Sequence, residues 1–203
     1  MKFSYLSAAA ALAMAAALAA CGGKAQYTVQ GIVYNLNNNG LVLANGSDTV
    51  TVPSGATSFS FPKQVDYGSD YNITIQKQPD HMTCGVSAGT GSAGHTVTIQ
   101  AGVSCEQNAY TLGGQFTGLT AAADGTARTI TVLNGSNSAI TLTSASATNG
   151  AGDFSFGTVK DGASYGVTVV VDPAMNLNCS IANGTGVMHE VAISNLLVTC
   201  VPK

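Results

Sequence analysis

The feature that most constrains the fold is a segment of the chain that occurs twice. The first copy runs from Tyr71 to Cys105 and the second from Tyr165 to Cys200. Each copy contains an alternating run that begins with Tyr, then a Pro, a Cys, a Gly-Thr-Gly tripeptide, a second β-rich run and a closing Cys. The two cysteines are separated by 21 residues in both copies. A repeat of this kind predicts two similar domains in tandem.

The similarity extends upstream of this segment. Gly31 matches Gly114, and Phe59 matches Phe154. The offset between matched positions grows from 83 at the glycines to 95 at the phenylalanines, so the second copy contains two insertions. Both insertions are rich in small and polar residues, which predicts long loops. They lie around Ala121–Arg128 and Ser144–Gly152.

The first copy is a succession of short runs with strand character. Asn45-Gly46 separates two of them and is a strong hairpin signal, while no window shows a sustained helical period. The expected strands are Tyr27–Tyr34, Gly40–Ala44, Asp48–Val52, Thr57–Phe61, Tyr71–Gln76, Cys84–Val86 and His95–Cys105. Seven short antiparallel strands predict a β-sandwich of immunoglobulin-like or transthyretin-like type. We therefore expect an all-β protein with one sandwich over residues 27–107 and a second over residues 108–203.

The four paired cysteines are expected to form disulfides within each repeat. Cys84 would pair with Cys105 and Cys179 with Cys200, each joining the last strand to the strand before it across a terminal hairpin. The Gly-Thr-Gly would then be part of the connecting turn. The alternative is a four-cysteine zinc site, but the close Cys pairs typical of such sites are absent, and an exported chain meets an oxidising compartment.

Residues 1–20 have the character of an export signal. Lys2 precedes an apolar run that is too short for a comfortable membrane span. The run ends in Leu18-Ala19-Ala20-Cys21, which resembles the bacterial lipobox. The resemblance implies that Cys21 becomes a lipid-modified N-terminus, followed by a short tether over residues 21–26. The alternative is an ordinary secretory signal cleaved near Ala20. Gly22 stands where an inner-membrane retention signal commonly has Asp, which implies the outer membrane.

The repeat as a whole resembles the tandem β-sandwich repeats of lipoproteins and surface proteins in Gram-negative bacteria. The resemblance implies a stalk, spacer or adhesion module. The matching positions are Gly31, Val33, Leu36, Gly40–Gly46, Phe59, Phe61, Tyr71–Pro79, Cys84, the Gly-Thr-Gly and Cys105.

Residues that could support chemistry are few. His81, His95 and His189 show no metal-ligand spacing and are interpreted as solvated loop histidines, and the four phenylalanines of the two Phe-x-Phe motifs as core. Asp66, Asp70 and Asp80 are a weak calcium candidate. No catalytic residue, metal or cofactor is expected. The net charge of −3 with only seven basic residues argues against binding to nucleic acid.

These features predict a non-enzymatic outer-membrane lipoprotein that acts through its surfaces. Its expected partners are the membrane, through the lipid anchor, and other envelope proteins or glycans. The alternative hypothesis is a module that binds a saccharide or peptide with the loops at one end of a sandwich, where Tyr34, Tyr67 and Phe116 are the available aromatic residues. A periplasmic hydrolase is a third hypothesis, without a nucleophile or metal motif to support it.

Overall fold

The computed structural model describes residues 24–96, 98–136 and 138–203. The signal segment 1–20, Cys21 and the first residues of the tether lie outside the described residues, so the signal helix and the lipid anchor stay predictions. Within the described ranges no helix has the length and apolar character needed to cross a membrane.

The first half of the chain is a sandwich of two four-stranded sheets. One sheet has the strand order β4-β1-β8-β6 and the other has the order β3-β2-β5-β7. The strands are β1 (Gln26–Tyr34), β2 (Leu41–Asn45), β3 (Asp48–Val52), β4 (Ser58–Asp66), β5 (Asp70–Lys77), β6 (Met82–Ser87), β7 (Thr90–Ser92) and β8 (Ile99–Gln107).

The second half repeats this topology strand for strand. Its two sheets have the orders β12-β9-β16-β14 and β11-β10-β13-β15. A short 3₁₀ helix, η2 (Pro173–Met175), precedes β14. The strands are β9 (Ala109–Thr117), β10 (Thr129–Asn134), β11 (Ser138–Thr143), β12 (Gly152–Lys160), β13 (Ser164–Val170), β14 (Leu177–Ala182), β15 (Thr185–Val187) and β16 (Ile193–Pro202). Both insertions expected in the second copy are loops, before β10 and before β12.

The all-β sandwich class is confirmed, but the expected strand count is wrong by one in each half. The Gly-Thr-Gly tripeptide is not a turn. Its Thr and second Gly begin the short strands β7 and β15, which pair with β5 and β13. Three-residue strands leave no alternating pattern in a sequence, so the expected count was seven instead of eight.

The expected strand directions also need a correction. Each half contains one parallel pair, because its first strand lies beside its last strand and runs the same way: β1 beside β8, and β9 beside β16. The chain therefore enters each sandwich at one end and leaves it at the other. The remaining pairs of named strands are antiparallel.

Strand β4 is longer than expected because Pro62 does not end it. Pro62 lies in a β-bulge, between the residue pairs Gln30–Ser60 and Thr28–Gln64. Since β4 is an edge strand with one neighbour, a residue without a backbone N–H is tolerated there.

Alternating side chains build a separate hydrophobic core in each half. Phe59 and Phe61 are buried in the first core, with their rings 5.9 Å apart and edge to face. Phe154 and Phe156 form the same pair in the second core, at 6.0 Å. The interpretation as core residues is confirmed for Phe59, Phe61 and Phe154, while Phe156 is partly buried and packs against the second core. Burying one such side chain stabilises a fold by about 1.5–3 kcal/mol.

A glycine opposite the first Phe of each pair is required for close packing. Gly31 pairs with Phe59 across the two strands, and Gly114 pairs with Phe154. A Cβ at Gly31 would meet the carbonyl oxygen of Ala101 on one neighbouring strand and the Phe59 ring on the other. The central strand of this sheet has no room for a side chain at that point.

Both expected disulfides are present. Cys84 bonds to Cys105 across β6 and β8, and Cys179 bonds to Cys200 across β14 and β16. The cysteines of each pair lie directly opposite each other. The connection between them is not a simple hairpin, however, because β7 and β15 cross to the opposite sheet before the chain returns.

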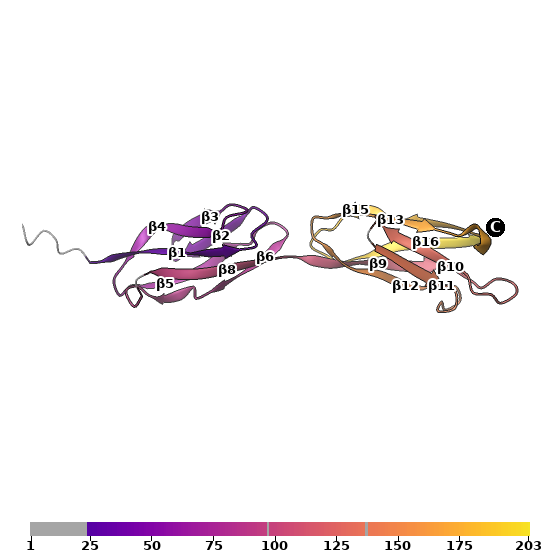
Figure 1. Cartoon of the computed structure of the whole chain (residues 1–203), viewed down its shortest axis with the longest axis horizontal. Helices are drawn as coiled ribbons and strands as arrows, with labels where there is room; N and C mark the ends of the chain where they lie inside the picture. The colour runs from indigo at the N-terminus through magenta and orange to yellow at the C-terminus, as the bar shows by residue number, and fades with distance from the viewer. Residues whose placement is uncertain (1–23, 97, 137) are drawn as a thin grey trace, which may run out of the picture.

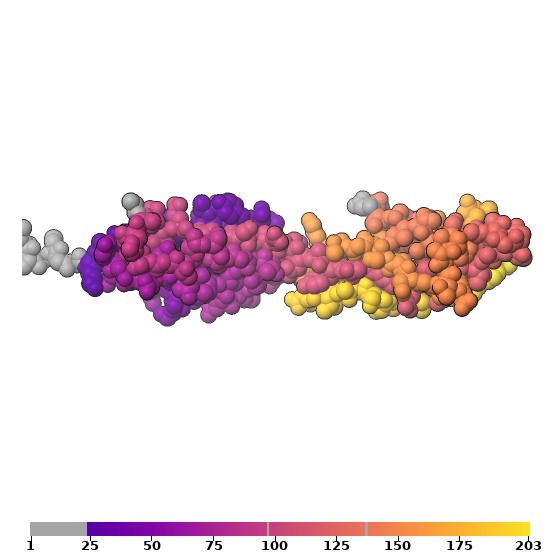
Figure 2. Space-filling model, turned by 90° about the horizontal axis from the view of Figure 1, so that it is seen from below, coloured from indigo at the N-terminus to yellow at the C-terminus, as the bar shows by residue number. Residues whose placement is uncertain are grey.

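The two sandwiches lie end to end and form an elongated molecule (Figure 1). The described chain begins at the outer end of the first sandwich and finishes at the outer end of the second. The space-filling view narrows where the two halves meet (Figure 2).

Candidate functional site: the junction between the two sandwiches

A single residue separates the last strand of the first half from the first strand of the second. Asn108 lies between β8 and β9 and is bonded on both sides. Its backbone N–H donates to the His81 carbonyl at 3.0 Å, and its own carbonyl accepts from the Asp161 N–H at 2.9 Å. The connection is therefore part of the hydrogen-bonded structure of both halves.

The side chain of Gln107 joins the same two loops. Its amide nitrogen, Nε2, donates to the backbone carbonyl of His81 at 2.9 Å and to that of Asp161 at 2.9 Å. One carbonyl belongs to the first half and the other to the second. A partly buried amide that satisfies two carbonyls avoids the cost of leaving either unpaired.

Asp161 is the buried charged residue of the junction. It follows β12, and its side chain has no exposed surface. Its Oδ1 atom accepts from the backbone N–H groups of Gly162 and Glu190, both at 3.0 Å. A buried carboxylate is costly unless it is paired, and these two N–H donors supply most of the pairing from within the second half.

The remaining carboxylate oxygen faces the first half. Asp161 Oδ2 lies 3.1 Å from Nδ1 of His81. Both atoms are buried, and among the described residues neither has another hydrogen-bond partner. The distance permits a hydrogen bond, but the approach is not well aligned for one, so we treat the contact as an electrostatic pairing between the two halves.

The His81 ring is also in contact with its surroundings on the second half. It lies against Gly162, where an added Cβ would come within 3.1 Å of the ring, and it meets the His189 ring edge to face at 6.2 Å. His81 itself has a left-handed backbone with a φ of 60°, and Glu190 has a φ of 56°. Non-glycine residues adopt this conformation at a cost, so the surrounding contacts must fix it.

The surroundings of Asp161 lower its pKa. Burial alone raises the pKa, because it disfavours the charged carboxylate. The N–H of Glu190, the nearby His81 and the N–H of Gly162 outweigh burial, so the pKa of Asp161 lies below its usual value. The carboxylate is therefore charged at neutral pH and stabilises the folded junction.

The interpretation of His81 as a solvated loop histidine is correct only in part: its side chain is 38% exposed, but its Nδ1 atom is buried against Asp161. His95 and His189 are exposed. Among the described residues no group of three or more His, Cys, Asp or Glu side chains could hold a metal ion.

The candidate calcium ligands do not gather in one place. Asp66 ends β4 and accepts from Gln26 at the start of β1, so it lies at the outer end of the first sandwich, as does Asp70 at the start of β5. Asp80 lies at the opposite end, where its carbonyl accepts from Asn38 near the junction. The calcium hypothesis is therefore not supported.

The aromatic residues considered for a loop-end binding site are also dispersed. Tyr34 is 53% exposed at the end of β1, on the junction side. Tyr67 is exposed at the outer end, where its ring lies 6.4 Å from that of Tyr27. Phe116 is buried in the core of the second half. The three rings cannot form one site.

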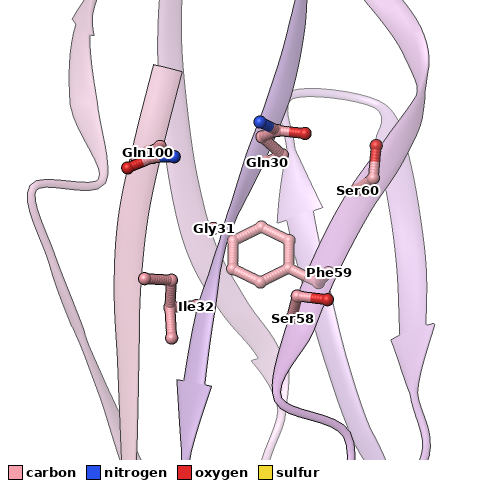
Figure 3. Close-up of a pocket in the computed structure, with 7 residues that line it drawn as sticks. All are labelled: Gln30, Gly31, Ile32, Ser58, Phe59, Ser60 and Gln100. Atoms are coloured by element: carbon pink, nitrogen blue, oxygen red, sulfur yellow. The ribbon is translucent and has the colours of Figure 1, made fainter. Parts of the chain in front are cut away.

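A shallow hollow lies on the sheet face above the Gly31–Phe59 pair. Figure 3 shows the Phe59 ring extending from β4 to Gly31 on β1, with five further side chains around it. The hollow has a volume of about 340 Å³, and a second hollow of about 340 Å³ covers the matching Gly114–Phe154 pair. Sites for small molecules usually enclose most of their ligand, which these open depressions do not. The lining residues around Phe59 and Gly31 are Gln30, Ile32, Ser58, Ser60 and Gln100.

Comparisons with known proteins give no family. No family model matches the chain. No curated protein matches it. Among solved structures it is similar to the major pilin of Streptococcus pyogenes, with 12% identity and a TM-score of 0.30 over 88% of this chain and 98% of that chain. It is also similar to the major pilin protein T3.2 of Streptococcus pyogenes, with 8% identity and a TM-score of 0.32 over 90% of this chain and 99% of that chain. TM-scores this low carry no inference about function.

Proposed function

We propose that this protein is a non-enzymatic, lipid-anchored spacer of the cell envelope that keeps its C-terminal end away from the membrane. Each sandwich is entered at one end and left at the other, so the length of the first adds to that of the second (Figure 1). The polar contacts at the junction oppose bending between them.

The junction is the observation that carries this proposal. Relative motion is the default for two domains joined by a narrow connection. Here Asn108 and Gln107 bond to backbone groups of both halves, and the buried Asp161 carboxylate faces His81 across the boundary. Bending would separate these groups and leave buried polar atoms unpaired, which costs about 1–3 kcal/mol per group.

The anchor rests on the lipobox-like sequence before Cys21. Acyl chains contribute about 0.8 kcal/mol per buried CH₂, and two or more chains give durable attachment to a bilayer. The tether between Cys21 and β1 would reach at most roughly 17 Å when extended. The first sandwich would thus lie close to the membrane and the second further out. We infer the outer membrane from Gly22.

Two measurements test the proposal on the mature full-length protein. Mass spectrometry of the N-terminus should find a diacylglyceryl-modified Cys21, and an unmodified Cys21 would refute the anchor. Spin labels at Thr49→Cys and Thr141→Cys, both exposed, should give one narrow interdomain distance. A broad distribution would show independent domains and would contradict the spacer. Asp161→Asn should broaden the distribution, and Asp70→Asn, an exposed control at the far end, should not.

A further inference from the structure

The edge strands β6 and β14 occupy the same place in the two halves but differ in how their outer edge is covered. In the first half the side-chain amide of Gln78 pairs with the backbone of Cys84. The Gln78 oxygen accepts from the Cys84 N–H at 2.8 Å, and the Gln78 nitrogen donates to the Cys84 carbonyl at 3.1 Å. This is the two-bond pattern that a neighbouring strand would make, supplied by one side chain.

The geometry of the disulfide pairs explains why the backbone N–H and carbonyl of Cys84 and Cys179 are free to bond on the outer side of their strands. The Cα atoms are 3.9 Å apart for Cys84 and Cys105, and 4.1 Å apart for Cys179 and Cys200. Such short separations are typical of non-hydrogen-bonded pairs in an antiparallel ladder. The N–H and carbonyl of Cys179 therefore point away from β16 toward the open edge, and those of Ile181, two residues further along, point the same way.

The second half has no counterpart of the Gln78 amide. The matching residue is Asp172, and its carboxylate accepts instead from the Ala174 N–H at the start of η2. Among the described residues no hydrogen bond covers the outward backbone groups of Cys179 or Ile181. Both side chains face the core yet are partly exposed, whereas Cys84 is 5% exposed in the first half.

Strand β14 also lacks the usual protection of an edge strand. Native proteins discourage edge pairing with charged residues, proline or bulges. Strand β4 has Pro62 and Lys63, and β12 has Asp153, Lys160 and a bulge. The sequence of β14, from Leu177 to Ala182, contains neither a charge nor a proline.

We propose that β14 is a self-association edge, where β14 of a second copy of this chain adds as an antiparallel neighbour centred on Cys179. The N–H and carbonyl of Cys179 would bond to the same groups of the partner copy, as Cys84 bonds to the Gln78 amide. In this register Leu177 faces Ile181 of the partner copy, and Asn178 faces Ser180. Apolar side chains meet apolar ones, polar side chains meet polar ones, and no like charges are opposed.

The association is expected to be weak. One short strand pair buries less than the roughly 1,000 Å² that stable interfaces need. In this antiparallel pair the long axes of the two copies run in opposite directions, so the contact joins copies whose anchored ends lie far apart instead of neighbours side by side on one membrane (Figure 1). The contact is isologous, so it gives pairs instead of open filaments.

Sedimentation equilibrium of the mature protein in density-matched detergent, up to millimolar concentrations, tests this proposal. A monomer–dimer equilibrium is expected, together with hydrogen-exchange protection of the Cys179 and Ile181 amides that grows with concentration. A chain that stays monomeric, with exchange rates independent of concentration, would overturn the proposal.

Matched variants locate the contact. Ile181→Pro removes an outward N–H without removing a bond to β16, and it should weaken dimerisation by about tenfold or more. Val86→Pro, two residues after Cys84 on β6, is the matched control in the first half and should leave dimerisation unchanged. Ser180→Lys, at an exposed side chain, places the two new lysines diagonally across the strand pair, each facing Asn178 of the partner copy, and their repulsion should weaken dimerisation in a salt-sensitive way. Dimerisation that withstands both Ile181→Pro and Ser180→Lys lies elsewhere, and the proposal is then wrong.

Discussion

His81 and Asp161 face each other across the boundary between the two sandwiches, with 3.1 Å between Nδ1 of the imidazole and Oδ2 of the carboxylate. They are separated by 80 residues of sequence. Each is fixed by its own half: His81 through its carbonyl, which accepts from Gln107 and Asn108, and Asp161 through the N–H groups of Gly162 and Glu190. The pair therefore reports directly on the relative position of the two halves.

The lowered pKa of Asp161 predicts a pH dependence of stability. A carboxyl whose pKa is lowered by folding contributes stability that is fully present above its unfolded pKa of about 4. That contribution is lost as the pH falls from about 4 through the lower folded pKa. Thermal unfolding of the wild type and Asp161→Asn should therefore differ most above pH 4 and converge in stronger acid. A constant difference down to the lowest pH would contradict this account.

The side chain of Gln107 must donate hydrogen bonds at the junction, so we expect its replacement by a hydrogen-bond acceptor to destabilise the protein. Gln107→Glu keeps the size of the side chain but turns a charged oxygen toward the carbonyls of His81 and Asp161. Loss of two partly buried hydrogen bonds should cost about 1–3 kcal/mol of unfolding free energy. Chemical denaturation measures the loss. Gln100→Glu on an exposed sheet face is the control, and an equal effect in both variants would exclude the bridging role.

A methyl group at Gly162 would press against the His81 ring, which would have to move by a few tenths of an ångström. Gly162→Ala places a Cβ about 3.1 Å from the ring, at a residue with a φ of 79° that L residues rarely adopt. We expect the variant to displace His81 and to broaden the distance between spin labels on the two halves. Gly125→Ala is the control, because Gly125 has a similar φ of 84° but no atom lies within 4 Å of the added Cβ. It measures the cost of the left-handed backbone alone. Equal broadening in the two variants would rule out a specific role for the His81 contact.

Gly31 is expected to be irreplaceable in the first core. Gly31→Ala forces β1 away from the Ala101 carbonyl and from the Phe59 ring, and overpacking of this kind costs about 3 kcal/mol. Denaturant unfolding of the first half measures it. Gly85→Ala, on an edge strand with open space around the Cβ, should change stability by less than about 0.5 kcal/mol.

The two disulfides should differ in their reactivity. Cys84 and Cys105 are both buried, whereas Cys179 is partly exposed at its uncovered edge. Partial reduction followed by alkylation and peptide mass spectrometry should therefore find the Cys179–Cys200 bond opened first. Loss of either bond should cost about 3 kcal/mol on the loop-entropy model. Preferential opening of Cys84–Cys105 would contradict the difference in exposure.

Most of the fold follows from local patterns in the sequence. Alternation around Phe59 and Phe61 predicts an inward face, and the equal cysteine spacings predict a pair of opposed residues in each half. These patterns are visible because each strand has one buried face. The short strands β7 and β15 were missed because their pairing depends on backbone groups, which every residue has.

The junction could not be predicted in the same way. Burial of the Asp161 side chain and of the His81 Nδ1 atom depends on how two separate sandwiches meet, and neither side chain belongs to a periodic pattern. One signal was present: the second copy has no histidine at the position that matches His81. A residue near the end of one repeat that its sister repeat lacks is a candidate for contact with the neighbouring repeat, since the two repeats contribute opposite ends to the junction.

The parallel arrangement of the first and last strand in each sandwich has a mechanical consequence. In the first half the β1–β8 ladder joins six pairs of residues, from Val29–Ile99 to Tyr34–Ser104. A pull on the two ends of the chain draws β1 and β8 in opposite directions along their length. The force then acts on all the hydrogen bonds of this ladder in shear, instead of opening them one after another from an end. The same holds for β9 and β16, so a molecule pulled at its two ends bears the load on its central ladders.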